Sequence, residues 1–66
     1  MADALSRREV QVLTLIAQGY TVPELAENLR LSVHTVTTHM KNIYGQLAVN
    51  NRVQAVNEAR RLGQIQ

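Results

Sequence analysis

The sequence contains no cysteine, no phenylalanine and no tryptophan. Without cysteine, disulfides and thiolate metal sites are excluded, and a reducing compartment is permitted. Tyr20 and Tyr44 are the only aromatic residues, although 45% of the 66 residues are hydrophobic. The core must therefore be built from Leu, Val, Ile, Met and Ala, which favours packed helices. A chain of this length has room for one small domain.

Long apolar runs are missing as well. The longest runs comprise only a few residues, far fewer than the roughly 20 that a membrane-spanning helix needs. We therefore expect a soluble, cytoplasmic domain with neither a secretory segment nor a membrane partner. Residues 1–4 show no pattern and are predicted to be a disordered lead-in to a single domain over residues 5–66.

Acidic residues are absent from the middle of the chain. The net charge is only +2, but no Asp or Glu lies between Glu27 and Glu58, whereas Arg30, Lys41 and Arg52 all do. This distribution creates a positive field in the centre of the sequence and favours a polyanionic partner.

Helix-start signals occur four times. Ser6 with Glu9 and Thr21 with Glu24 are capping boxes, and each precedes a segment with helical apolar spacing. Further caps are predicted at Ser32 with Thr35 and at Asn51 with Gln54. The sequence therefore predicts an all-α fold, a compact four-helix domain containing a helix-turn-helix, with helices at about 7–18, 22–30, 33–47 and 52–62.

The segment 33–47 has two contrasting faces. On a helix of about 3.6 residues per turn, one apolar stripe is formed by Val33, Val36, Met40, Ile43 and Leu47. The opposite face carries hydroxyls, an amide, an imidazole and one ammonium group, but no carboxylate; its residues include His34, Thr37, Thr38, Lys41 and Asn42. Short donors and acceptors without acids suit the edges of bases, so we interpret this segment as a DNA recognition helix.

The sequence resembles the LuxR-type (FixJ/GerE-like) DNA-binding domain of bacterial transcription regulators. The resemblance runs through Leu5-Ser6-x-Arg8-Glu9, Val12-Leu13, Ile16-Ala17-x-Gly19, Glu24-Leu25-Ala26, Leu29, Leu31-Ser32, Thr35-Val36-x-x-His39, Asn42-Ile43-Tyr44, Leu47-x-Val49 and Asn51-Arg52-x-x-Ala55. It implies sequence-specific binding of double-stranded DNA for transcription regulation, with segment 33–47 in the major groove. It further implies a homodimer on DNA through segment 52–62, an upstream sensory domain in the full-length protein, and RNA polymerase as a partner.

The resemblance also assigns roles to individual residues. Base readout is expected from Thr37, Thr38 and Lys41, with His34 and Asn42 beside them. Phosphate contacts are expected from Ser32 and Thr35 at the helix start and from Arg52; for the first two the alternative is plain capping. For Arg52 the alternatives are a solvated charge or an ion pair with Glu9. A dimer interface is expected from Val53, Asn57 and Arg60, which share one side of the last helix.

Three residues depart from the family pattern. Thr37 and Gln46 stand where basic residues are common, and Ala48 replaces a glycine. Loss of two cationic contacts predicts weaker and less salt-sensitive binding, which relies on dimerisation. Thr37 still offers a hydroxyl and a methyl group, which shifts the expected preference toward A·T contacts. Ala48 predicts either strain at the helix end or a different turn.

Enzymatic and metal-binding functions are not expected. No nucleophile and base occur at a workable spacing, and no glycine loop for phosphates is present. His34 and His39 fall on different sides of a helix and do not share a metal, and we expect His39 and Tyr44 to be partly buried packing residues. No cofactor is predicted. The alternative to DNA binding is a helical dimerisation or interaction module in which DNA binding is weakened or lost.

Overall fold

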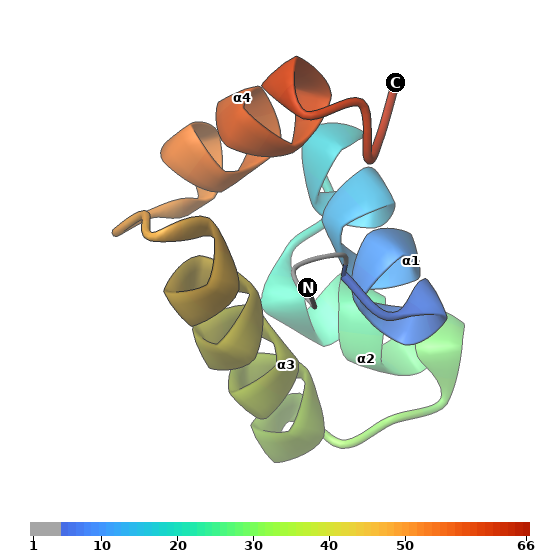
Figure 1. Cartoon of the computed structure of the whole chain (residues 1–66). Coiled ribbons are helices and arrows are strands. Elements are labelled where there is room, and N and C mark those ends of the chain that lie inside the picture. Colours follow the sequence, from blue (N-terminus) through green and yellow to red (C-terminus); the bar gives the residue numbers. More distant parts are fainter. Residues whose placement is uncertain (1–4) are drawn as a thin grey trace.

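Four helices make up the fold. The computed structural model describes residues 5–66, which form α1 (Arg7–Ala17), α2 (Val22–Leu29), α3 (Val33–Leu47) and α4 (Arg52–Arg61), and this range contains no strand (Figure 1). The predicted all-α class with a helix-turn-helix is confirmed. The lead-in predicted for residues 1–4 lies outside the described residues.

Every helix begins where its capping signal predicted. The hydroxyl of Ser6 accepts a bond from the Glu9 N–H at 3.1 Å, and the Glu9 carboxylate accepts one from the Ser6 N–H at 3.0 Å. Thr21 and Glu24 form the same reciprocal pair. The cap of α4 differs slightly, because the side chain of Gln54 accepts from the N–H of Asn50. Since these bonds satisfy backbone donors that a helix leaves free, they fix the start of each helix.

Three helices end one residue before their predicted last residue. The structure ends α1, α2 and α4 at Ala17, Leu29 and Arg61, and α3 ends at Leu47 as predicted. After α2, Arg30 adopts a left-handed conformation with φ 58°, and the N–H of Leu31 donates to Ala26 at 2.9 Å. A non-glycine residue in this conformation is unusual, and no glycine stands at this position to mark the end of the helix.

The helices bury a single aliphatic core. α3 packs against each of the other three helices, and α1 also contacts α2 and α4. The buried residues are Leu5, Val12, Leu13, Ile16, Leu25, Ala26, Val36, Met40, Ile43, Leu47, Ala55, Val56 and Ala59. Ala55 and Ala59 are fully buried, so the small side chains of α4 let its backbone lie close to α1 and α3.

Two residues expected in the core are exposed. Val33, the predicted start of the α3 stripe, is 51% exposed, and Leu62, a predicted inward residue of the last helix, is 47% exposed. Both lie at helix ends, where the apolar periodicity continues in the sequence but the neighbouring helices no longer cover it. Among residues 5–66, no helix combines the length and hydrophobicity needed to cross a membrane.

Candidate nucleic-acid interface

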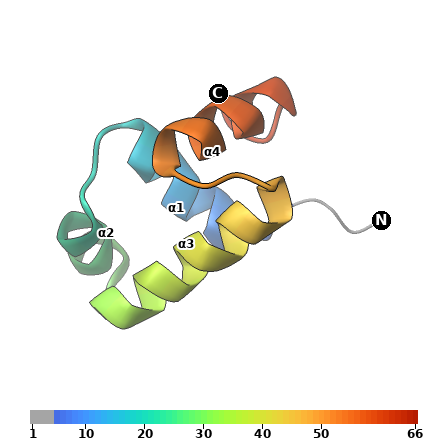
Figure 2. The ribbon, with the colours of Figure 1, turned by 90° about the vertical axis from the view of Figure 1, so that its left-hand side faces the viewer.

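The helix-turn-helix consists of α2, a three-residue turn and α3. Figure 2 shows α3 along the front of the molecule, with α1 behind it and α4 above it. Val36, Met40, Ile43 and Leu47 anchor α3 on the core by one face. The opposite face of α3 is therefore left open along its length.

The structure brings the five residues predicted for base readout onto this open face. The side chains of all five are exposed: His34, Thr37, Thr38, Lys41 and Asn42. We call this set the α3 outer face. Since Val33–Leu47 contains no Asp or Glu, the face carries one cation and four uncharged polar groups with His neutral, and no carboxylate on this helix repels a phosphate.

Thr37 is the one residue of the α3 outer face whose side chain is engaged within residues 5–66. Its hydroxyl donates to the backbone carbonyl of Val33 at 3.0 Å, four residues back along the helix. Among the described residues, the other four side chains form neither a hydrogen bond nor an ion pair with the protein. Their donors and acceptors are available to a ligand.

The two residues predicted to contact phosphate at the start of α3 form the N-terminal cap of this helix. The Ser32 hydroxyl accepts from the Thr35 N–H at 3.0 Å and donates to the Thr35 hydroxyl at 2.9 Å. Ser32 is exposed and Thr35 is half-buried. The capping alternative is thus present in the structure, while the helix N-terminus beside it remains a favourable place for an anion.

The ion pair with Glu9, one of the alternatives for Arg52, does not form in the structure. The Arg52 guanidinium donates instead to the backbone carbonyl of Tyr20 at 3.3 Å, in the connection between α1 and α2. Glu9 is bound by the side-chain amide of Gln46, at 3.1 and 3.2 Å. Arg52 opens α4 beside the end of α1, whereas Glu9 lies in the first turn of α1 and faces the last turn of α3.

Gln46 therefore has a structural role in this chain, because it links α3 to α1. The family pattern predicts the loss of a cationic DNA contact at Gln46, but in the structure its amide donates to Glu9 of α1. Arg30, by contrast, was not among the predicted site residues. It is exposed at the first position of the turn, two residues before Ser32. Its place in the acid-free interval was the signal in the sequence.

The predicted dimer residues form a patch on α4. Val53, Asn57 and Arg60 are exposed, and Val53 reaches 65%. With Ile16, Ala17, Arg52 and Val56 they line a shallow cleft of about 230 Å³. Arg60 also donates to the backbone carbonyl of Gln66 at 3.1 Å. An exposed valine beside a cleft with a mixed apolar and polar lining is a feature suited to contact with another surface.

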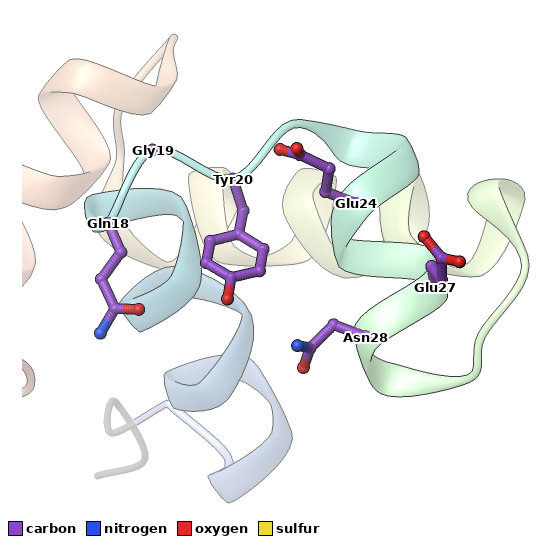
Figure 3. Close-up of a pocket in the computed structure, with 6 residues that line it drawn as sticks. All are labelled: Gln18, Gly19, Tyr20, Glu24, Glu27 and Asn28. Carbon is purple, nitrogen blue, oxygen red and sulfur yellow. The ribbon is translucent and has the colours of Figure 1, made fainter.

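A second cleft, of about 440 Å³, lies between the end of α1 and α2 (Figure 3). Its lining residues are Gln18, Gly19, Tyr20, Glu24, Glu27 and Asn28. Because two carboxylates line it, this cleft is unsuited to a polyanion and is separate from the α3 outer face. Within residues 5–66, no three His, Asp or Glu side chains are grouped as a metal site would require.

His39 and Tyr44 occupy the positions expected of packing residues. Both are half-buried, and Tyr44 packs against the hydrophobic core. Neither belongs to the α3 outer face.

Comparison with known proteins identifies relatives over nearly the whole chain. Residues 3–59 match the family described as bacterial regulatory proteins, luxR family. The transcriptional regulatory protein LiaR of Bacillus subtilis (strain 168) is 42% identical over 59 residues, and the HTH-type transcriptional regulator MalT of Yersinia pestis (strain Pestoides F) is 43% identical over 61 residues. These alignments cover 89% and 92% of this chain, but only 28% of LiaR and 7% of MalT.

Two solved structures share the fold. The response regulator ChrA of a heme-sensing two-component system has a TM-score of 0.92 at 42% identity, covering 94% of this chain and 31% of the ChrA chain. The transcription factor GerE has a TM-score of 0.89 at 32% identity, covering 94% of this chain and 92% of its own. The chain therefore belongs to the LuxR family of bacterial regulatory proteins and is a helix-turn-helix domain of DNA-binding transcription regulators.

Proposed function

We propose that this domain binds double-stranded DNA sequence-specifically, with α3 in the major groove and the α3 outer face toward the bases. The observation that carries this proposal is the exposed and acid-free polar face of α3, opposite its buried stripe. A helix with its side chains is about 10–12 Å across, which fits a major groove about 12 Å wide. In this orientation Thr37, Thr38 and Lys41 read base edges, with His34 and Asn42 beside them.

Phosphate contacts surround this face. We assign them to Ser32 and Thr35 at the start of α3, to Arg52, and in addition to Arg30 in the turn. One of the five N–H donors of the Arg52 guanidinium is bonded to the backbone carbonyl of Tyr20. The remaining donors are sufficient for a phosphate, so anchoring the connection after α1 and contacting DNA are compatible roles.

Dimerisation through α4 completes the proposal. A single domain whose α3 outer face carries only one cation gains little from counterion release, so two domains on adjacent half-sites bind usefully where one does not. Val53, Asn57 and Arg60 provide the exposed patch that a two-fold contact requires. LiaR and MalT are much longer than the region that matches this chain. We further propose that the full-length protein carries an upstream sensory domain. We also propose that the regulator acts in the cytoplasm on RNA polymerase.

Fluorescence anisotropy with a labelled random duplex at two salt concentrations tests the proposal. We expect binding that weakens as salt rises, and tighter binding to a duplex selected from a random library. The test variant Lys41→Ala, on the α3 outer face, should weaken binding, whereas the control variant Gln11→Ala, at an exposed residue of α1, should not. Absence of salt-dependent binding at low salt and high protein concentration would exclude DNA binding.

A helical interaction module is the second candidate function, because Thr37 replaces a basic residue on the α3 outer face. The second departure that favoured it, Gln46, no longer does so, since Gln46 binds Glu9. Self-association of the domain without salt-dependent DNA binding would support this candidate.

A further inference from the structure

Thr37 and Thr38 are adjacent and both exposed, yet their hydroxyls differ in their hydrogen bonds. The Thr37 hydroxyl donates its proton to the Val33 carbonyl at 3.0 Å. Within residues 5–66 the Thr38 side chain has no such partner. A hydroxyl has one proton and two lone pairs. Thr37 therefore presents an acceptor and a methyl group to a ligand, whereas Thr38 presents a donor as well.

Base pairs differ in what they offer to an acceptor and a methyl group. In the major groove guanine presents only the acceptors O6 and N7, whereas adenine presents its N6 amine and cytosine its N4 amine. Thymine adds a C5-methyl group that makes apolar contact with a threonine methyl. An A·T pair is thus the pair that satisfies both groups of Thr37.

From this difference we infer that Thr37 is a specificity-determining residue, which selects an A·T pair and rejects guanine at the position it faces. The inference rests on the proposed docking of α3 in the major groove. It goes beyond that proposal because it assigns one base pair to one side chain.

The hydrogen bond from Thr37 to the Val33 carbonyl favours A·T over G·C already in the free protein. To donate to guanine, the Thr37 hydroxyl must give up its existing bond, so the net gain is small. To accept from adenine N6, it keeps that bond and adds a second one, and a hydroxyl that already donates is a better acceptor. The helix itself therefore disfavours guanine, without any clash.

The experiment uses the 66-residue chain and a duplex selected by binding from a random library. At each A·T pair in turn, adenine is replaced by purine, which lacks the N6 amine, or thymine by uracil, which lacks the methyl group. In each half-site we expect one pair at which each replacement weakens binding about fivefold, the lower end of the cost of one mismatched pair. A G·C pair at that position is expected to bind more weakly still.

Variants of Thr37 then test whether this side chain causes the response at the base pair found in this way. Thr37→Val keeps the methyl group and should lose the response to purine while retaining the response to uracil. Thr37→Ser keeps the hydroxyl and should show the reverse pattern. The matched control, Thr38→Val, should leave both responses at this pair in place. Since both positions are exposed, circular dichroism should confirm that all variants remain folded.

Two results would overturn the inference and are distinguishable from each other. Tight, salt-dependent binding in which no response depends on Thr37, or in which guanine is preferred at its pair, contradicts the inference and leaves the proposed function intact. Absence of salt-dependent binding to every duplex removes the proposed function, and the inference with it.

Discussion

The side-chain amide of Gln46 donates to both carboxylate oxygens of Glu9, at 3.1 and 3.2 Å. Glu9 is only 8% exposed, and one of its oxygens also accepts from the N–H of Ser6. A carboxylate this well buried is costly unless it is hydrogen-bonded. Gln46 therefore satisfies a buried charge without a cation, and in doing so it joins the last turn of α3 to the first turn of α1.

Removal of this amide should destabilise the domain. We expect Gln46→Ala to lower the free energy of unfolding by about 1.5 kcal/mol, the lower end for hydrogen bonds to charged groups because Gln46 itself is exposed. Urea denaturation measures the change. Gln11→Ala, an exposed glutamine on α1 with no hydrogen bond among the described residues, is the matched control and should change stability by less than about 0.5 kcal/mol. Equal losses in the two variants would mean that the Gln46–Glu9 bond contributes nothing.

The Gln46–Glu9 pair marks the difference between local features, which the sequence predicts, and long-range contacts, which it does not. Helix starts were predictable because caps such as Ser6 with Glu9 are local, lying three residues apart. The open face of α3 was predictable because periodicity alone separates Thr37 and Lys41 from the buried stripe. The partner of Glu9 was not predictable: Gln46 is 37 residues away, and the choice between it and Arg52 depends on how α3 and α4 pack against α1.

Helix ends were less predictable than helix starts, for a related reason. Arg30 and Ala48 adopt left-handed conformations at φ 58° and 57° although neither is glycine. The residue after each of them donates its N–H back to the helix, Leu31 to Ala26 at 2.9 Å and Val49 to Tyr44 at 3.0 Å. Leu31 and Val49 also pack against the core, and together these contacts hold the left-handed conformation against local preference. Val33 and Leu62 were misassigned to the core because periodicity does not report how far a neighbouring helix extends.

Replacement of Ala48, just after α3, by glycine and of Gly45, within α3, by alanine should stabilise the fold. The left-handed conformation of Ala48 costs about 1–2 kcal/mol, so Ala48→Gly should raise the free energy of unfolding by about 1 kcal/mol. Gly45 is helical, and a Cβ there would meet nothing within 4 Å. Gly45→Ala should therefore add about 0.5–1 kcal/mol.

Thermal denaturation of both single variants and the double variant measures the effect. For a domain of this size, each kcal/mol corresponds to about 4–8 °C in Tm. Gly63→Ala serves as the opposite control, because Gly63 has φ 75° and an alanine there is strained. A loss of stability in Ala48→Gly would show that the left-handed conformation is not a source of strain.

Val53→Gln should weaken self-association without unfolding the domain. Val53 is 65% exposed, so its replacement by a neutral helix-forming residue changes neither the core nor the net charge. We expect a lower dimer affinity in sedimentation equilibrium and loss of cooperative binding to a duplex with two half-sites. Leu62→Gln is the matched control, because Leu62 is exposed at the end of α4 but is nine residues away and lies on the other side of the helix. Equal effects of the two variants would contradict a dimer contact at Val53.

Lys41→Ala should weaken DNA binding and reduce its dependence on salt. Lys41 supplies the only cation of the α3 outer face with His neutral, and its removal is expected to lower the slope of log affinity against log salt by about 0.9. Anisotropy titrations of the selected duplex at several salt concentrations give both the affinity and the slope of its salt dependence.

Arg61→Gln removes a cation that is already paired and serves as the control. Arg61 contacts Glu58 at 2.6 Å, and this side-chain hydrogen bond lowers the pKa of Glu58 and raises that of Arg61. Because the Arg61 cation is removed, the net charge falls by one, as it does in Lys41→Ala. The change nevertheless occurs at the end of α4, away from the α3 outer face. A smaller change in slope for Arg61→Gln than for Lys41→Ala separates a local contact from the effect of net charge. Unchanged affinity and slope in Lys41→Ala would remove Lys41 from the interface.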